Sequence, residues 1–324
     1  MQKLTIVMYH YVRPIKNSRY PGIKGLELDL FKEQLNFVGK NFKVVTVEKV
    51  IEAVSGKAVL PNQAMLLTFD DGYRDHYEYV FPLLRQCGMQ GSFYVPSAVV
   101  EHHRVLDTNK IHYILAGADI NSLMSKLYGM LDDYRQDGYR ENDYVLEPNE
   151  ELYAKLARAN RWDPAEVIFL KRLLQTYLPE KLRHEIVDRL FLDIMNLSEE
   201  AFAKELYINM DEIREMKKEG MFFGLHGSDH IWLNKVTEEH MMQDISHSKD
   251  YFADVMDPEY LVMNYPYGGY NEAVVNYVRS IGCKVGITVE ARMARIGVDD
   301  PMLLPRLDTN DLPPKSENYR EYIV

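Results

Sequence analysis

Two adjacent aspartates, Asp70 and Asp71, follow an apolar run and precede a glycine in the sequence Thr68-Phe69-Asp70-Asp71-Gly72. Burial at the end of a strand raises the pKa of each carboxyl, and each negative charge raises the pKa of its neighbour. A metal ion, a shared proton or a nearby cation relieves this cost, and all three indicate chemistry. The alternative is an ordinary turn, in which aspartate caps and glycine supplies a positive φ.

Two histidines four residues apart, His226 and His230, follow a second apolar run, Phe222–Leu225. This spacing can place both imidazoles on one side of a turn. In an open α/β sheet the carboxyl ends of the strands bind ligands, and we expect the histidines and the aspartates there. Two histidines and one aspartate suit zinc with an open position for water, which leaves the second aspartate free as a base. The facial triad of non-haem iron oxygenases uses the same ligands and is an alternative.

The elements that must position these residues alternate between strands and helices. Strands are predicted at Leu4–Tyr9, Phe42–Val45, Met65–Phe69, Ser92–Val95, Phe222–Leu225, Tyr260–Met263, Val285–Val289 and Leu303–Leu307. Helices are predicted after the N-caps Asp29 and Thr46, and at Tyr79–Leu84, Asp211–Lys218, Glu238–Phe252 and Glu272–Ile281. This alternation predicts an α/β fold with a largely parallel sheet and helices outside it.

The alternation stops after about residue 100, and helical patterns dominate from Asn109 to Glu205, where no strand is predicted. We therefore predict one sheet domain in two segments, 1–104 and 206–312, interrupted by a helical insertion over 105–205. The insertion would act as a packed cap or as a lid. A polar tail over 313–324 is predicted to be mobile.

Composition narrows the function classes. The 324-residue chain has a formal charge of −11, which argues against binding to nucleic acid or to an anionic lipid surface. The sequence contains no run of 18 apolar residues, so no membrane span is predicted, and the first residues do not have the pattern of a signal peptide. The distant cysteines Cys87 and Cys283 are interpreted as buried free thiols of a reducing compartment. We therefore expect a cytoplasmic enzyme.

A third predicted strand end carries Tyr265-Pro266-Tyr267-Gly268, a sharp turn with backbone N–H groups at the same edge of the sheet. Together with Thr68–Gly72 and the histidine pair, in this order, it resembles the polysaccharide deacetylase family, which includes chitooligosaccharide and peptidoglycan N-deacetylases. The resemblance covers residues 1–100 and 210–310. It implies a deformed or incomplete (β/α) barrel, a divalent metal (zinc, or cobalt or nickel), and hydrolytic removal of acetyl from an N-acetylated sugar.

The resemblance also implies roles for particular residues of this chain. Asp71, His226 and His230 would hold the metal. Asp70 would be the general base, and the backbone N–H of Tyr267 would join the metal in stabilising the oxyanion.

Two positions depart from the family's common pattern. Asn264 stands where many members have an arginine that orients the base, and Arg306 is the candidate replacement. No histidine follows His247, so the usual late general acid is missing. His10, in Met8-Tyr9-His10-Tyr11, resembles a permuted version found in poly-N-acetylglucosamine deacetylases and would then be the general acid; the alternative is a structural histidine at a strand end. Asp308 or Asp311 could orient His10 or Arg306.

Several residues and one whole-protein alternative remain. The histidines of the insertion and the helices are interpreted as solvated or structural, namely His102, His103, His112 and His240. Trp232 either stacks on a sugar ring or packs in the core. The expected partner is an N-acetylated sugar, an oligosaccharide or a nucleotide- or lipid-linked sugar, and the insertion could also serve a homodimer. The vacant arginine position keeps open a catalytically inactive sugar-binding or assembly protein.

Overall fold

The computed structural model describes residues 2–141, 144–159 and 163–322, and its chain forms two compact units. The sheet unit comprises Met1–Pro14, Gly25–Arg104 and Ala203–Val324, and the helical unit comprises Ile15–Lys24 and Val105–Phe202. Ile15–Lys24 thus groups with the helices although it lies outside the predicted insertion. The last two residues of the predicted tail, 323–324, lie outside the described residues.

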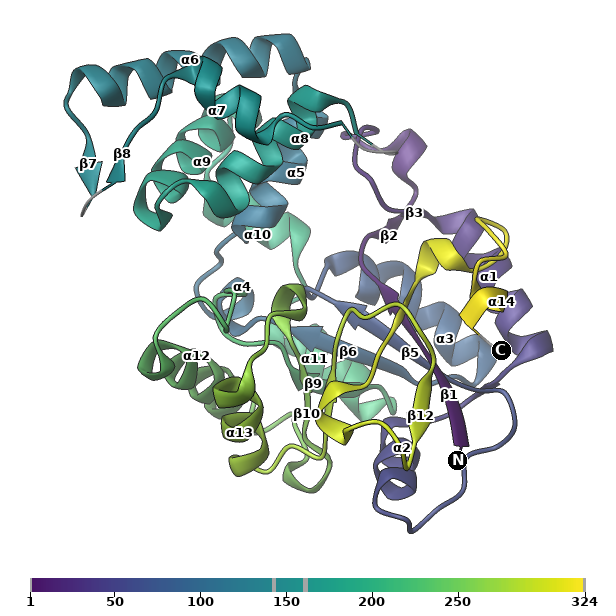
Figure 1. Cartoon of the computed structure of the whole chain (residues 1–324). Helices are drawn as coiled ribbons and strands as arrows, with labels where there is room; N and C mark the ends of the chain where they lie inside the picture. Colours follow the sequence, from purple (N-terminus) through teal and green to yellow (C-terminus); the bar gives the residue numbers. More distant parts are fainter. Residues whose placement is uncertain (1, 142–143, 160–162, 323–324) are drawn as a thin grey trace. The chain divides into compact units, whose positions relative to one another are not determined.

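A curled, largely parallel sheet forms the core of the sheet unit (Figure 1). Its main path runs β11-β10-β9-β6-β5-β1-β12, while β4 pairs with β5 and β13 with β1. The strands are β1 (Gln2–Tyr9), β4 (Lys43–Val44), β5 (Ala64–Asp70), β6 (Gly91–Val95), β9 (Phe222–Leu225), β10 (Val262–Asn264), β11 (Val285–Ile287), β12 (Ala294–Ile296) and β13 (Leu307–Asp308). Among the described strand pairings of this sheet, β1–β12 alone is antiparallel and the others are parallel, which confirms the predicted α/β class.

The segment from Leu304 to Asp308 connects the two ends of the curled sheet. Leu304 forms a parallel bridge with Ile287 of β11, and Leu307 pairs with Val7 of β1. The predicted strand Leu303–Leu307 is therefore misplaced, because Pro301–Leu303 is a 3₁₀ turn and the strand begins only at Leu307. The curled sheet forms a half-barrel, which confirms the predicted deformed or incomplete barrel.

Helices of the sheet unit follow the strands, and β5 between β1 and β6 is buried throughout. The helices are α1 (Leu28–Asn41), α2 (Val47–Val54), α3 (Phe81–Cys87), α4 (Ser97–Glu101), α11 (Met210–Lys218), α12 (Glu238–Tyr251), α13 (Glu272–Ser280) and α14 (Tyr319–Tyr322). Thr46 caps α2 as predicted, since its side chain accepts the backbone N–H of Lys49. Asp29 does not cap α1: the helix already begins at Leu28, with Glu27 at the N-cap position, and the Asp29 carboxylate pairs with Lys32 at 2.9 Å.

The helical unit contains α5 (Asp107–Gly117), α6 (Ile120–Gln136), α7 (Asn149–Leu156), α8 (Ala165–Arg172), α9 (Glu180–Met195) and the start of α10 (Glu199–Leu206). The buried Lys110 of α5 forms ion pairs with Asp188 of α9, at 2.5 Å, and with Glu199, at 2.9 Å. The short β7–β8 pair (Arg140–Glu141 with Tyr144–Val145) falls in the region where no strand was predicted.

The tail and the cysteines depart from expectation. The ring of Tyr319 is buried and packs edge-on against Phe37, with centroids 5.4 Å apart, so this part of the tail is held against α1. Cys283 is buried as predicted, but Cys87 is exposed at the end of α3; both are free thiols. Within the described ranges, no helix is both long and apolar enough to cross a membrane.

Candidate active site

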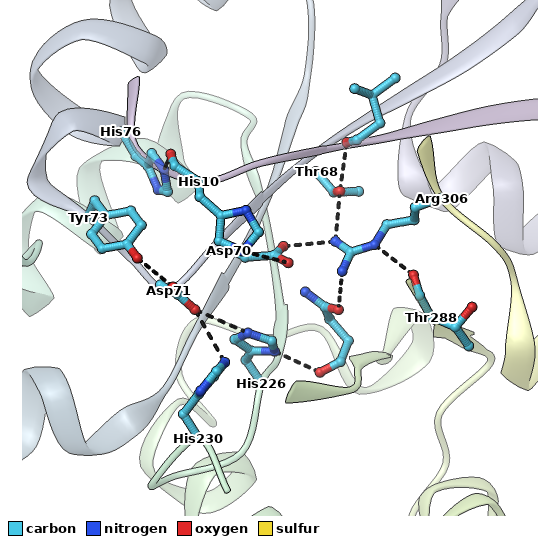
Figure 2. A network of polar contacts seen from close by, with 12 residues as sticks. His10, Thr68, Asp70, Asp71, Tyr73, His76, His226, His230, Thr288 and Arg306 are labelled. Carbon is cyan, nitrogen blue, oxygen red and sulfur yellow. Dashed lines mark hydrogen bonds and ion pairs between the residues drawn. The ribbon is translucent and has the colours of Figure 1, made fainter. Parts of the chain in front are cut away.

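The predicted site residues other than Tyr267 meet at the carboxyl ends of the parallel strands (Figure 2). Asp70 is the last residue of β5, and His10 directly follows β1. His226 directly follows β9, whose partner strands are β6 and β10. Parallel strands end at one edge of a sheet, so residues far apart in sequence become neighbours there.

Asp71, His226 and His230 converge on one point. The Oδ1 atom of Asp71 lies 3.5 Å from Nε2 of His226 and 3.4 Å from Nε2 of His230. All three side chains are buried. Their chemistry is that of a tetrahedral site with three protein ligands and one open position.

The neighbours of the triad fix its protonation and orientation. Nδ1–H of His226 donates to the backbone carbonyl of Asn264 at 2.7 Å, which leaves the lone pair of Nε2 facing Asp71. Burial lowers the pKa of His230 to about 4, so this imidazole is neutral at pH 7. Burial raises the pKa of Asp71, but the charge that His230 gains at low pH, together with the neighbouring His226, outweighs burial and holds the Asp71 pKa well below its usual value.

Tyr73 occupies the second oxygen of the Asp71 carboxylate. Its hydroxyl donates to Oδ2 at 2.5 Å, and Oδ1 is buried without a hydrogen-bond partner among the described residues. A buried anionic oxygen without a donor is costly, and a cation at this point would remove the cost. The residues present therefore fit a divalent metal held by Asp71, His226 and His230.

Three non-glycine residues of the site have positive φ. The angles are 72° at Asp71, 53° at His230 and 57° at Tyr267. Such conformations cost about 1–3 kcal/mol each and persist where the surrounding structure imposes them, as at ligand sites. Their concentration at this edge of the sheet is independent support for a functional site.

Asp70 is held by Arg306 rather than by the triad. Nη1 of Arg306 donates to Oδ1 of Asp70 at 2.9 Å, and both side chains are almost completely buried. Burial raises the pKa of Asp70, but the guanidinium outweighs burial and keeps the pKa below its usual value. Asp70 is therefore ionised at neutral pH, as a base must be.

Arg306 also binds three other groups at the carboxyl edge. It donates to the hydroxyl of Thr68 at 3.1 Å, to the side-chain oxygen of Asn264 at 3.0 Å and to the carbonyl of Thr288 at 2.9 Å. Arg306 lies in the segment that connects the two ends of the sheet, which explains how a residue so late in the chain reaches β5. The structure thus brings the predicted replacement to the base.

His10 approaches Asp70 from the other side. Its Nε2 atom lies 3.9 Å from Oδ2 of Asp70, and 41% of its side chain is exposed. The carbonyl of His10 accepts a hydrogen bond from Nε2 of His76 at 2.9 Å, and burial lowers the pKa of His76 to about 4. The hydrogen bond from His76 fixes the backbone of His10, and the half-exposed His10 imidazole lies beside the proposed base, where it can exchange protons with a bound molecule.

An aromatic wall borders the triad. Tyr267 lies against His230, with ring centroids 4.4 Å apart, and stacks on Trp232 at 4.7 Å and 9°. Nζ of Lys235 lies 4.3 Å from the centre of the Trp232 ring. Trp232 is half-buried, so neither predicted alternative, core packing or sugar stacking, is excluded by its burial.

Two predicted contacts take another form. The Asp308 side chain accepts the N–H of Asn310, and the Asp311 side chain accepts the N–H of Asp308, so the two form a capping box instead of orienting His10 or Arg306. Sequence reasoning also missed Tyr73 and His76. Their proximity to the Asp70-Asp71 pair is the only signal in the sequence that could have indicated them.

Comparison with solved structures places the fold among deacetylases. The deacetylase PplD of Streptococcus pyogenes, solved in complex with acetate, superposes with a TM-score of 0.60 at 17% identity and covers 99% of this chain and 98% of its own. IcaB of Ammonifex degensii gives a TM-score of 0.56 at 17% identity, covering 99% and 96%. At sequence identities this low, the structural likeness establishes the shared fold alone.

The sequence establishes the family. The family model described as polysaccharide deacetylase matches residues 57–161 and 191–286, more than half of the chain, and the chain belongs to this family. The match reaches into the predicted insertion, which the resemblance did not cover, and it does not include residues 1–56 and 287–310, which the resemblance did cover. A poly-β-1,6-N-acetyl-D-glucosamine N-deacetylase of Escherichia coli is 40% identical over 55 residues, which are 17% of this chain and 8% of that protein. The chain spans less than a third of the length of the curated relatives it matches.

Proposed function

We propose that this protein is a metal-dependent hydrolase that removes the acetyl group from the amide of an N-acetylated sugar. One observation carries the proposal: a buried Asp71–His226–His230 triad lies beside a second carboxylate, Asp70, that Arg306 keeps ionised. If the two aspartates had only a structural role, there would be no reason for one to face two histidines and the other to be kept ionised by an arginine.

The metal would be zinc, or cobalt or nickel, held by Asp71, His226 and His230. Bound there, such an ion would supply a Lewis acid for the amide oxygen and would lower the pKa of a bound water towards about 7. Membership of a deacetylase family and the orphaned oxygen of Asp71 support this ligand set.

The chain's own side chains and one backbone N–H would carry out the remaining steps. Asp70 accepts a proton from the attacking water, and the buried Arg306 keeps it available for that role. The backbone N–H of Tyr267 donates to the oxyanion, a contribution typically of roughly 3–4 kcal/mol. His10 donates a proton to the departing amine, since it is the half-exposed imidazole beside Asp70.

The substrate is proposed to be an N-acetylglucosamine-containing oligosaccharide or a nucleotide- or lipid-linked precursor of one. Because the Escherichia coli relative is a poly-β-1,6-N-acetyl-D-glucosamine N-deacetylase, β-1,6-linked N-acetylglucosamine oligomers are the first compounds to test. Trp232 and Tyr267 offer an aromatic face for a sugar ring. Cytoplasmic location and a homodimer stay predictions.

Acetate release tests the proposal and separates it from the inactive sugar-binding alternative. Zinc-reconstituted protein is incubated with β-1,6-linked N-acetylglucosamine oligomers, chitooligosaccharides and a nucleotide-linked N-acetyl sugar, beside Asp70→Asn. We expect acetate from at least one compound, and an Asp70→Asn variant that binds this compound but releases acetate at least 100-fold more slowly. Binding without acetate release by the wild type would favour the inactive alternative, and near-normal turnover by Asp70→Asn would refute the assigned base.

A further inference from the structure

We propose a second divalent-metal site, formed by Glu101, His102 and His247 on the surface of the sheet unit and suited to zinc. Glu101 is the last residue of α4, His102 is its C-cap, and His247 lies on α12. The site is separate from the buried triad and does not depend on the proposed deacetylase activity.

The geometry points both imidazoles at one carboxylate. Nε2 of His247 lies 2.6 Å from Oε2 of Glu101, and Nε2 of His102 lies 3.8 Å from the same oxygen. One ligand atom from each of the three residues lies within 4.8 Å of the others. The two imidazole rings are nearly parallel, at 20° with centroids 6.4 Å apart, so both present the Nε2 edge to Glu101.

The donor set and its exposure suit a zinc-type ion. Two imidazole nitrogens and one carboxylate oxygen are the ligands of three-residue zinc sites, with water in the fourth position. About half of each imidazole is exposed, 53% in His102 and 48% in His247, so an ion can enter from solvent and the side chains can adjust to it. The ion would replace the His247–Glu101 hydrogen bond and bind Nε2 of the neutral imidazole, whose one ring proton then lies on Nδ1.

The two helices that carry this site also hold the loop between His226 and His230. At the start of α4, the N–H of Ser97 donates to the carbonyl of Gly227 at 3.2 Å, and the N–H of Ala98 donates to that of Ser228 at 3.1 Å. The hydroxyls of Ser97 and Ser228 are also 3.0 Å apart. Through these contacts the first turn of α4 fixes the path of the loop.

From α12, the buried Asp244 holds the same loop. Its carboxylate accepts the N–H of Ser228 at 3.0 Å and the N–H of Asp229 at 2.8 Å. A Cβ atom at Gly227, whose φ is +70°, would lie 2.4 Å from Oδ2 of Asp244, so the loop needs glycine at this point. An ion that joins α4 to α12 therefore braces the two supports of the His226–His230 loop.

Zinc stoichiometry tests the site. Metal-free protein is saturated with zinc, passed through a desalting column and analysed for zinc, beside His102→Gln, His247→Gln and the matched control His240→Gln, which changes another exposed histidine of α12. We expect His102→Gln and His247→Gln to hold one zinc ion fewer than the wild type, and His240→Gln to match the wild type. The metal-free melting temperature of each variant checks that it is folded.

A His226→Ala variant separates this proposal from the deacetylase site. If both sites are real, the wild type holds two zinc ions, His226→Ala one, and His226→Ala with His247→Gln none. If only the surface site is real, the wild type and His226→Ala each hold one ion, and His247→Gln holds none. Equal zinc in the wild type and His247→Gln would overturn the surface site, whatever happens at the triad.

Discussion

The Arg306→Met substitution tests how the site keeps a buried carboxylate ionised. Arg306 makes four hydrogen bonds, to Thr68, Asp70, Asn264 and Thr288, and the Arg306 and Asp70 side chains are only 1% and 3% exposed. Removing one partner of a buried ion pair leaves an uncompensated charge and costs about 3–5 kcal/mol. We therefore expect Arg306→Met to lower the free energy of unfolding by about that amount at pH 7.

The sign of the pH dependence identifies the charge as the cause. In the wild type the pKa of Asp70 lies below its usual value, so its contribution to stability is present at neutral pH and is lost as pH falls through the folded-state pKa. Without the guanidinium, burial dominates and raises the pKa, so folding then favours the protonated carboxyl. The penalty of Arg306→Met should therefore shrink as the pH falls from 7 towards 4, and the acidic limb of kcat/KM should move to higher pH.

Urea unfolding followed by Trp232 fluorescence measures this penalty. Trp232 belongs to the sheet unit, and a Trp162→Phe background removes the chain's other tryptophan; EDTA keeps metal occupancy out of the comparison. The double variant Arg306→Met with Asp70→Asn should recover at least half of the lost free energy, because the carboxamide carries no charge. Arg306→Lys, which keeps a charge but not the fork, should keep the acidic limb closer to that of the wild type. Additive single-variant effects and a pH-independent penalty would refute the reasoning.

Three further predictions concern neighbours of the site. Tyr73→Phe removes the hydroxyl that holds Asp71, so zinc affinity measured by chelator competition should fall roughly 10- to 100-fold, whereas Tyr77→Phe should leave it unchanged. Burial lowers the pKa of His76 from 6.5 to about 4, so the free energy of unfolding of the wild type should fall by roughly 3 kcal/mol relative to that of His76→Gln as the pH falls from 6.5 to 4. Urea unfolding with EDTA measures this difference, and parallel pH profiles of the two proteins would contradict it. Trp232→Ala should raise KM for the acetylated sugar about three- to tenfold with little change in kcat, and an unchanged KM would assign Trp232 to packing alone.

The sequence could predict those parts of the site whose residues directly follow a single predicted strand. Asp70 and Asp71 follow one buried strand, and His226 and His230 follow another, so the rule that parallel strands share a carboxyl edge was enough to bring them together. The family's motif order then divided the two aspartates into a ligand and a base, a division that spacing alone left open.

The parts that the sequence could not predict depend on tertiary pairing. Arg306 was named as a replacement, but its four partners follow from the way Leu304 and Leu307 connect β11 to β1, which no local pattern encodes. The roles of Tyr73 and His76 likewise depend on which atoms lie opposite them. The preference of aspartate for N-cap positions gave a wrong prediction at Asp29, because α1 already begins at Leu28 and the Asp29 carboxylate pairs with a lysine instead of capping the helix.

Zinc titration of metal-free protein, with acetate release from an N-acetylglucosamine oligomer as the readout, tests whether a metal at the triad drives deacetylation. We expect no acetate from the metal-free protein and activity that rises with added zinc until the Asp71–His226–His230 site is full. Asp70→Asn should bind zinc at this site like the wild type and stay inactive. Full acetate release by the metal-free protein, or none from any N-acetylated sugar after zinc is bound at the triad, would rule out a metal-dependent deacetylase.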